Sequence, residues 1–205
     1  MKESKLYRFI VTLIRPFARL LYRLEVRGLE NVPSKGKVIL CPNHTSNADP
    51  VLLAITLKRQ IYFMAKAELF NNKLLGKLFK MVGAFPVNRG KGDSSAIDTA
   101  EDILENGEQL GLFIEGTRSK TGEFLRPKTG CAMIAYKTTT PILPICISGK
   151  NEHTVKIFRK NIISIGKPIL TSELSIKEET GKEFRNASRF IMENIKDLDP
   201  VDYSK

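Results

Sequence analysis

Residues 37–57 read KVILCPNHTSNADPVLLAITL, and this stretch decides the fold class. Its first five residues are mostly apolar and β-forming, a polar segment of turn formers follows, and an apolar run begins after Asp49 and Pro50. Asp before Pro is a strong helix start, because an Asp side chain can accept hydrogen bonds from the free N–H groups and Pro suits the first helical position. The stretch therefore predicts a strand, a turn and a helix capped by Asp49.

The same alternation of short strands and helices continues on both sides of this stretch. Strands are predicted at 24–27, 37–41, 61–65, 84–87, 111–114, 142–148 and 162–165. Helices are predicted near 50–57, 69–81, 94–105, 128–137 and 177–197. This order predicts an α/β fold with a mixed central sheet flanked by helices. Since we find no repeat or low-complexity linker, residues 24–205 are expected to form one domain.

Residues 1–23 predict a separate N-terminal amphipathic helix, kinked near Pro16, which removes a backbone donor. Its basic side chains fall within about 80° of a helical wheel, opposite a wide apolar face. This pattern is typical of a helix lying in the headgroup region of a bilayer, although a helix packed on a protein core has the same pattern. Six basic residues against one acidic residue favour the membrane. The predicted membrane-binding residues are Arg8, Arg15, Arg19 and Arg23.

The charge balance indicates an anionic partner. The 33 Lys and Arg residues exceed the 22 Asp and Glu residues, for a net charge of +11, which suits nucleic acid, a membrane surface or a phosphorylated substrate. Three widely spaced cysteines without a CxxC pair argue against a disulfide framework and favour a reducing compartment. We recognise no secretory signal, and the apolar runs are far shorter than the roughly 20 residues of a membrane-spanning helix.

Within residues 37–57, His44 is the side chain best suited to take part in a reaction. Its polar neighbours give it no packing role, whereas Asp49 has a complete structural explanation as a helix cap. The two side chains can meet only if His44 lies in a turn and Asp49 starts the next helix; the carboxylate would then hold one ring nitrogen and leave the other free as a base. Either a plain turn or a catalytic pair fits these residues.

An enzyme nucleophile and a metal site are both poorly supported. The chain has no G-x-S-x-G elbow, and its two histidines are more than a hundred residues apart without clustered cysteines. If His44 is a base, it activates a hydroxyl of the substrate. Two arginines in turns after strands, Arg89 and Arg118, form a fair pair of phosphate ligands, although each alone has the simpler reading of a solvated turn residue.

Four blocks together resemble the 1-acylglycerol-3-phosphate acyltransferase family of glycerophospholipid acyltransferases. NHTSNADP (43–50) matches its Asn-His-x4-Asp-Pro motif, and FIEGTRS (113–119) matches its Phe-x-Glu-Gly-Thr-Arg-Ser motif. AKAELF (65–70) with GAFPVNRG (83–90), and PILPICISG (141–149), resemble two further blocks. The blocks occur in family order over residues 38–149; the departures are modest, such as Thr45 where Gln is frequent.

The resemblance implies direct transfer of a fatty acyl group from a thioester to the sn-2 hydroxyl of 1-acyl-sn-glycerol 3-phosphate, giving phosphatidic acid without an acyl-enzyme. His44 would be the general base, with Asp49 orienting and charging its imidazole. Acyl-CoA or acyl carrier protein would be the donor, with no cofactor or metal. The implied phosphate ligands are Arg89, Arg118, Lys66 and Lys128, and the implied acceptor-site residues are Asn43, Glu115, Gly116 and Thr117.

Other functions stay open at this point. The acceptor can be another lysolipid or glycerol 3-phosphate. A basic membrane-surface or nucleic-acid binding protein is a different class, but a nucleic-acid binder is disfavoured because the chain has no Trp, five Tyr and no recognisable binding motif. We therefore expect a peripheral protein on the cytoplasmic face of the cell membrane, with a lysophosphatidate-type acceptor and an anionic lipid surface as partners and no nucleic acid.

Overall fold

A seven-stranded mixed sheet forms the centre of the molecule. We describe it from a computed structural model covering residues 5–88, 94–150 and 152–201. The strand order is β1-β7-β6-β2-β5-β3-β4, and all neighbours are parallel except β6 and β7. The bounds are β1 Leu24–Arg27, β2 Val38–Pro42, β3 Ile61–Lys66, β4 Ala84–Val87, β5 Gln109–Gly111, β6 Ile142–Gly149 and β7 Asn161–Ile165. The predicted mixed sheet is confirmed.

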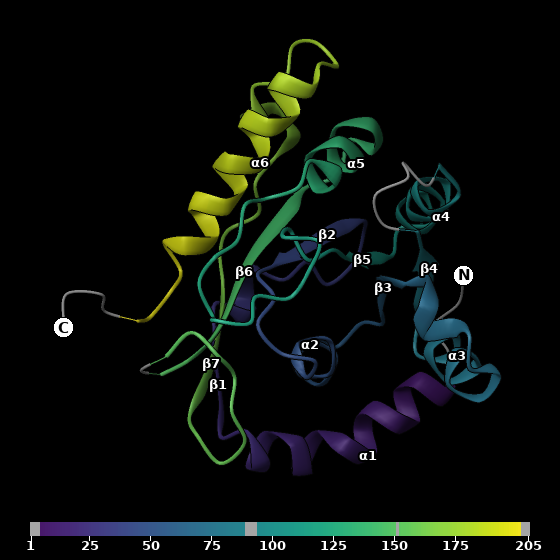
Figure 1. The fold of residues 1–205 in the computed structure, drawn as a ribbon, viewed down its shortest axis with the longest axis vertical. Coiled ribbons are helices and arrows are strands. Elements are labelled where there is room, and N and C mark those ends of the chain that lie inside the picture. The colour runs from purple at the N-terminus through teal and green to yellow at the C-terminus, as the bar shows by residue number, and fades with distance from the viewer. Residues whose placement is uncertain (1–4, 89–93, 151, 202–205) are drawn as a thin grey trace.

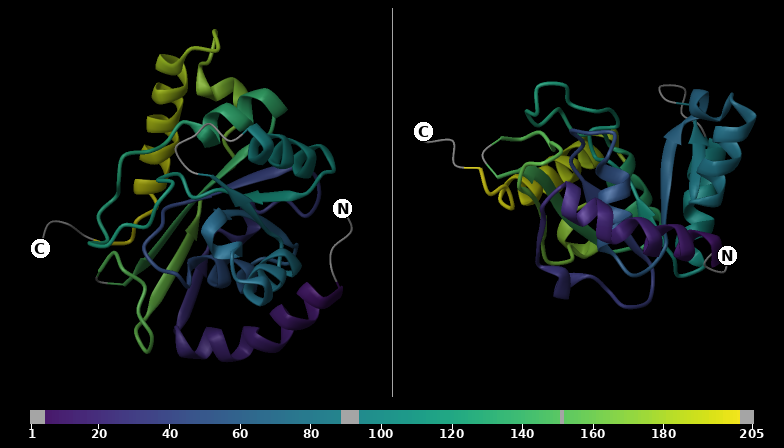
Figure 2. Two further views of the ribbon diagram at one scale, coloured as in Figure 1. Left: turned by 45° about the vertical axis from the view of Figure 1, so that its right-hand side comes forward. Right: turned by 90° about the horizontal axis from the view of Figure 1, so that it is seen from below.

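Helices cover both faces of this sheet (Figures 1 and 2). Helices α1 and α2 belong to one hydrophobic cluster, and α4, α5 and α6 belong to the other. The α-helices are α1 Lys5–Leu21, α2 Asp49–Thr56, α3 Lys73–Met81, α4 Ser94–Glu105, α5 Gly130–Thr138 and α6 Gly181–Lys196. Short 3-10 turns lie at Leu29–Asn31, Ala67–Phe70 and Thr171–Leu174.

Strand β2 shows why the sheet carries two cores. Its successive side chains point to opposite faces, so Val38 and Leu40 pack with α1 and α2, while Ile39 and Cys41 pack with α4, α5 and α6. All four residues are fully buried. A strand buried on both faces reads as the unbroken apolar run seen in the sequence.

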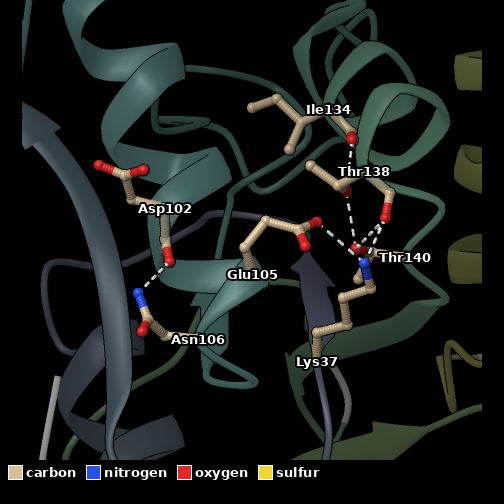
Figure 3. A network of polar contacts seen from close by, with 7 residues as sticks. All are labelled: Lys37, Asp102, Glu105, Asn106, Ile134, Thr138 and Thr140. Carbon is tan, nitrogen blue, oxygen red and sulfur yellow. Dashed lines mark hydrogen bonds and ion pairs between the residues drawn. The ribbon is translucent and has the colours of Figure 1, made fainter.

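A polar network fixes the start of β2 at the edge opposite its carboxyl end (Figure 3). Lys37 Nζ donates to Glu105 Oε1 of α4 at 3.0 Å and to the Thr138 carbonyl of α5 at 2.6 Å. The Thr138 and Thr140 hydroxyls lie 2.7 Å apart and extend the network. Because Lys37 joins two helices to one strand, it holds the end of the sheet that lies away from His44.

Strand β5 corrects one sequence prediction. It begins at Gln109, not at Gly111. The polar Gln109 side chain gave no sign of a strand position in the sequence, yet it is fully buried in the sheet. Beyond Gly111 the chain stays beside β2, since Leu112 N–H donates to Leu40 O and Ile114 N–H donates to Pro42 O, whereas the pairing of β5 with β3 ends at Gly111. The predicted segment 111–114 is therefore the continuation of the strand toward the site.

Helix α1 runs without a break through Pro16, and its axis curves in Figure 1. Tyr7 and Val11 are buried with the α2 side of the core, so the helix does cover the core along one stripe. A second apolar stripe is exposed, made of Leu6, Phe9, Leu13, Phe17 and Leu20. The two interpretations of the sequence pattern therefore apply to two different faces of one helix.

Candidate active site

The carboxyl ends of five strands meet at one edge of the sheet. β2, β3, β4, β5 and β6 run in the same direction, so the segments that follow them gather there. In parallel sheets this edge is where ligands bind. The Asn43–Asp49 segment follows β2, and the Glu115–Ser119 segment follows β5.

His44 and Asp49 form a close pair at this edge. His44 Nδ1 lies 2.8 Å from Asp49 Oδ2, and the same oxygen accepts the backbone N–H groups of Thr45 and Ser46, each at 2.8 Å. Asp49 is fully buried, whereas 15% of the His44 side chain is exposed. No described residue hydrogen-bonds to His44 Nε2. The outer ring nitrogen is therefore open to a substrate while the inner one is held.

The structure corrects the expected role of Asp49 as a helix cap. Asp49 is the first residue of α2, Ala48 is the cap residue, and no side chain caps this helix. The carboxylate turns back to the loop that precedes it, because three donors converge there on Oδ2. Asp49 thus shapes the His44 loop instead of satisfying the N–H groups of α2.

An aromatic stack that the sequence analysis did not identify supports the His44 ring. The Phe113 ring stacks on it with centroids 4.0 Å apart and planes at 26°, and Phe63 stacks behind Phe113 at 5.9 Å. Gly111 is needed beneath this stack, since a Cβ there would come within 2.3 Å of the Phe63 ring. Phe113 opens the FIEGTRS block, but its strand position reads as ordinary core.

The segment after β5 is tied directly to the His44 loop. Ser119 N–H donates to His44 O at 2.8 Å. Glu115 is buried, and its carboxyl group accepts hydrogen bonds from the backbone N–H of Leu125, at 3.4 Å, and from the backbone N–H of His44. Burial raises the pKa of Glu115 to about 7; the two backbone donors oppose this rise and the negative charge of Asp49 adds to it. Glu115 therefore joins both loops from inside the protein.

Asn43 also acts from inside the structure. It is buried, its Nδ2 donates to Ile147 O at 3.0 Å, and its Oδ1 accepts Ile147 N–H at 2.7 Å. This pair of bonds imitates a strand pairing and carries the order of β2 and β6 one residue further, up to His44. Its predicted acceptor-site role stays a prediction, but the contacts seen are those of a positioning residue.

The predicted cations lie around the same edge with different environments. Arg118 is exposed, and no described residue pairs with its guanidinium. Lys128 is exposed and packs over Gly116, which has a φ of 67°, and Thr117 beside it is exposed. Lys66 ends β3 and its Nζ lies 2.9 Å from Glu68. Arg89 falls outside the described residues, so its role as a phosphate ligand stays a prediction.

The predicted membrane-binding arginines of residues 1–23 differ in their surroundings. Arg15 is half-buried and donates to Leu57 O at 3.3 Å, at the end of α2. Arg8, Arg19 and Arg23 are exposed. Within the described residues, no helix has both the length and the apolar character to cross a bilayer, and no three His, Cys, Asp or Glu side chains gather as a metal site would require.

The fold is an α/β sheet that holds a buried carboxylate and a half-open histidine together at its ligand-binding edge, an arrangement suited to an enzyme. The acyltransferase family model matches residues 23–148, which is more than half of the chain, and the chain belongs to this family.

Named relatives and a solved structure agree with that membership. The chain is 32% identical to a 1-acyl-sn-glycerol-3-phosphate acyltransferase of Bacillus subtilis over 167 residues. These residues make up 80% of this chain and 82% of the Bacillus subtilis protein. It is 32% identical to the Borreliella burgdorferi protein of the same name, over 69% of this chain and 56% of that one. A 1-acyl-sn-glycerophosphate acyltransferase from Thermotoga maritima shares the fold, with a TM-score of 0.71 at 24% identity, over 100% of this chain and 86% of that chain.

Proposed function

We propose that the protein transfers a fatty acyl group from an acyl thioester to the sn-2 hydroxyl of 1-acyl-sn-glycerol 3-phosphate, giving phosphatidic acid for phospholipid synthesis. The names of its relatives support this substrate. The observation that carries the mechanism is the His44 imidazole, whose Nδ1 is held by Asp49 and whose Nε2 is open.

In this mechanism the acceptor hydroxyl gives its proton to His44 Nε2 as its oxygen attacks the thioester carbonyl carbon. The new C–O bond forms, the C–S bond breaks, and the departing thiolate takes the proton back from the imidazolium. Asp49 stabilises the positive charge that develops on the ring, and the Phe113 stack keeps the ring in plane. Neither an enzyme nucleophile nor a cofactor takes part.

The acceptor phosphate is placed on Arg118 and Arg89, with Lys128 and Lys66 as further cations. Arg118 is suited to this because its guanidinium is exposed and has no pairing residue in the described part of the chain. It also lies directly before Ser119, whose N–H donates to His44 O. A guanidinium binds phosphate in bidentate fashion, which fixes the orientation of the glycerol. Acyl-CoA or acyl carrier protein serves as the donor.

The protein is proposed to act as a peripheral protein on the cytoplasmic face of the cell membrane, held by α1. The support is the exposed stripe of Leu6, Phe9, Leu13, Phe17 and Leu20 beside exposed arginines. Such an apolar surface beside basic residues fits the headgroup region of an anionic bilayer.

An acceptor panel tests the reaction. The purified protein is assayed with 1-acyl-sn-glycerol 3-phosphate, other lysolipids and glycerol 3-phosphate, each with acyl-CoA and acyl carrier protein, and the products are resolved by mass spectrometry. His44→Ala and His44→Gln should lower the rate about 10²–10⁴-fold. His153→Gln is the matched control, because His153 is the other histidine of the chain and is also paired with an aspartate, Asp199, at 3.1 Å. Near-normal turnover by a folded His44 variant would exclude this mechanism.

A further inference from the structure

The loop between β6 and β7 meets the C-terminal end of α1. Phe158 N–H donates to Leu21 O at 2.8 Å, and Asn161 Nδ2 donates to Tyr22 O at 2.6 Å. In Figure 1 this green loop descends to the same end of the molecule as α1. Two segments more than a hundred residues apart in the sequence therefore share one surface.

This surface is apolar. Phe158 is 73% exposed and Ile157 is 48% exposed at the tip of the loop. On the last turns of α1, where the loop meets the helix, Leu20 is 79% exposed and Phe17 is 71% exposed. Large side chains so exposed together mark a surface that binds something. We name these four residues the apolar corner.

The loop is built to hold Phe158 outward. Phe158 has a φ of 61°, a left-handed conformation that bulky residues rarely adopt, and it persists only where surrounding contacts impose it. The fully buried Asn161 supplies those contacts: its Oδ1 accepts Lys156 N–H at 3.0 Å, and its Nδ2 donates to the carbonyls of Lys156 and Arg159, each at 2.9 Å. The exposed phenylalanine therefore sits on a fixed support.

Exposed basic side chains lie on the same two segments as the apolar corner. Lys156, Arg159 and Lys160 are exposed on the loop, and Arg19 and Arg23 are exposed at the end of α1. Lys156 pairs with Glu152 and Lys160 with Glu25, whereas no described residue pairs with Arg159. An apolar tip within a basic rim is complementary to an anionic lipid surface, where the tip enters the acyl boundary and the cations meet headgroups.

We propose that residues 155–160 form a second membrane-inserting element, which places Ile157 and Phe158 in the boundary between headgroups and acyl chains beside the end of α1. The proposal rests on the membrane-bound state proposed above, but the observations on the loop itself carry it. A protein held at a membrane by one interfacial helix can still rotate about the axis of that helix. A second insertion point at the C-terminal end of α1 stops this rotation of the protein and fixes which edge of the sheet faces the lipid.

Single-tryptophan variants test the insertion, because the chain contains no Trp. Phe158→Trp is mixed with vesicles of phosphatidylglycerol and phosphatidylcholine, with and without brominated acyl chains. We expect a blue-shifted emission and at least a twofold quenching by the brominated lipid. Ile157→Trp is the second loop variant, free of the left-handed backbone, and should behave alike. Phe190→Trp is the matched control, because Phe190 is also partly exposed but lies on helix α6 and not on the loop. The emission of this variant should change little when vesicles are added.

A charge series adds an independent measure. Changing Lys156 and Arg159 to Gln should weaken binding to anionic vesicles roughly fivefold for each charge removed. Changing Lys182 and Arg189 on α6 to Gln should leave this binding unchanged. If the protein sediments with vesicles but neither loop tryptophan is quenched, the loop inference is wrong and α1 alone anchors the protein.

Other outcomes also decide against the loop. A blue shift that grows with protein concentration in the absence of lipid would show that a second copy covers the apolar corner, and would overturn the proposal. No sedimentation with any vesicle would overturn both the loop and the α1 anchor. The acyl-transfer reaction is judged separately, by repeating the acceptor panel with short-chain, water-soluble acceptors.

Discussion

The Asp49 carboxylate is where three donors converge on one oxygen, and its second oxygen, Oδ1, is buried without a partner among the described residues. An Asn at this position keeps the acceptor only by turning its NH2 group to the side where Oδ1 finds no acceptor. In the proposed mechanism the change also removes the charge that stabilises the His44 imidazolium. Because Asp49 does not cap α2, its substitution affects the His44 loop itself.

Asp49→Asn is therefore expected to lower both activity and stability. The weakened hydrogen bonds should cost about 1–3 kcal/mol of unfolding free energy, and turnover should fall by orders of magnitude. Urea unfolding and steady-state rates measure the two effects. Asp102→Asn on the exposed side of α4 is the control, and equal effects of the two substitutions would contradict the role of Asp49.

Glu115→Gln tests the buried carboxyl through pH. Burial raises the pKa of Glu115 from 4.5 to about 7, so between these pH values the folded protein binds more protons than the unfolded chain. Stability contributed by this group is therefore lost as the pH rises from 4.5 to 7, by an amount of about 3 kcal/mol at most. The Gln variant cannot titrate, and its stability relative to the wild type should increase over this pH range.

Chemical unfolding at pH 4.5, 6 and 8 measures the difference. Glu123→Gln, which changes an exposed carboxyl further along the chain, is the matched control. A parallel pH dependence of the Glu115→Gln variant and the wild type would show that Glu115 is not the group responsible.

Arg118→Ala should weaken binding of the phosphorylated acceptor more than binding of the acyl donor. A charge-assisted hydrogen bond to phosphate contributes about 1.5–3 kcal/mol, so KM for the acceptor should rise roughly 10–150-fold. Arg126→Ala, also exposed and eight residues further along the chain, is the matched control. Equal loss with a neutral monoacylglycerol acceptor would show that Arg118 does not bind the phosphate.

At the scale of elements, α1 divides its apolar residues between the protein and the solvent. Phe9, Leu13 and Phe17 are exposed, while Tyr7 and Val11 are buried against the α2 side of the core. Changing the first three together to Ser should strongly weaken sedimentation with anionic vesicles and leave the melting temperature within a few degrees. Val11→Ser is the matched control with the opposite result, because it places a hydroxyl in the core. Vesicle binding by the triple variant as strong as that of the wild type would exclude the exposed stripe as the anchor.

Much of this organisation was predictable from the sequence, and the exceptions have physical causes. Apolar runs and turn formers gave the strands and helices to within a few residues, since burial on both faces imposes them. Local rules failed for Gln109, whose polar side chain is buried in a strand, and for Asp49, whose carboxylate is oriented by tertiary contacts. A helical wheel also cannot tell which apolar residues of α1 meet α2, and neither Phe113 nor Phe158 has a local signal for its position.

At the scale of the whole molecule, the boundary between residues 1–23 and the rest is not a boundary between independent parts. Arg15 donates to Leu57 O, Phe158 N–H donates to Leu21 O, and Asn161 donates to Tyr22 O. The N-terminal helix is therefore joined to α2 at one side and to the β6–β7 loop at its end. In the proposed membrane-bound state, a helix joined in this way would fix the orientation of the sheet relative to the lipid.

Deleting residues 1–21 should consequently destabilise the whole protein. Burial of Tyr7 and Val11 contributes about 1.5–3 kcal/mol for each side chain, so a loss of about 3–6 kcal/mol is expected, together with newly exposed core around Leu53 and Ile55. Urea unfolding measures this loss, and dilution tests whether the shortened chain aggregates. The Phe9, Leu13 and Phe17 triple variant is the comparison, because it removes the exposed stripe but keeps the packed one. If the deletion unfolds at the same urea concentration as the full chain, α1 is a separable anchor; if only the triple variant stays stable, the helix belongs to the fold and its outer face alone is available to the lipid.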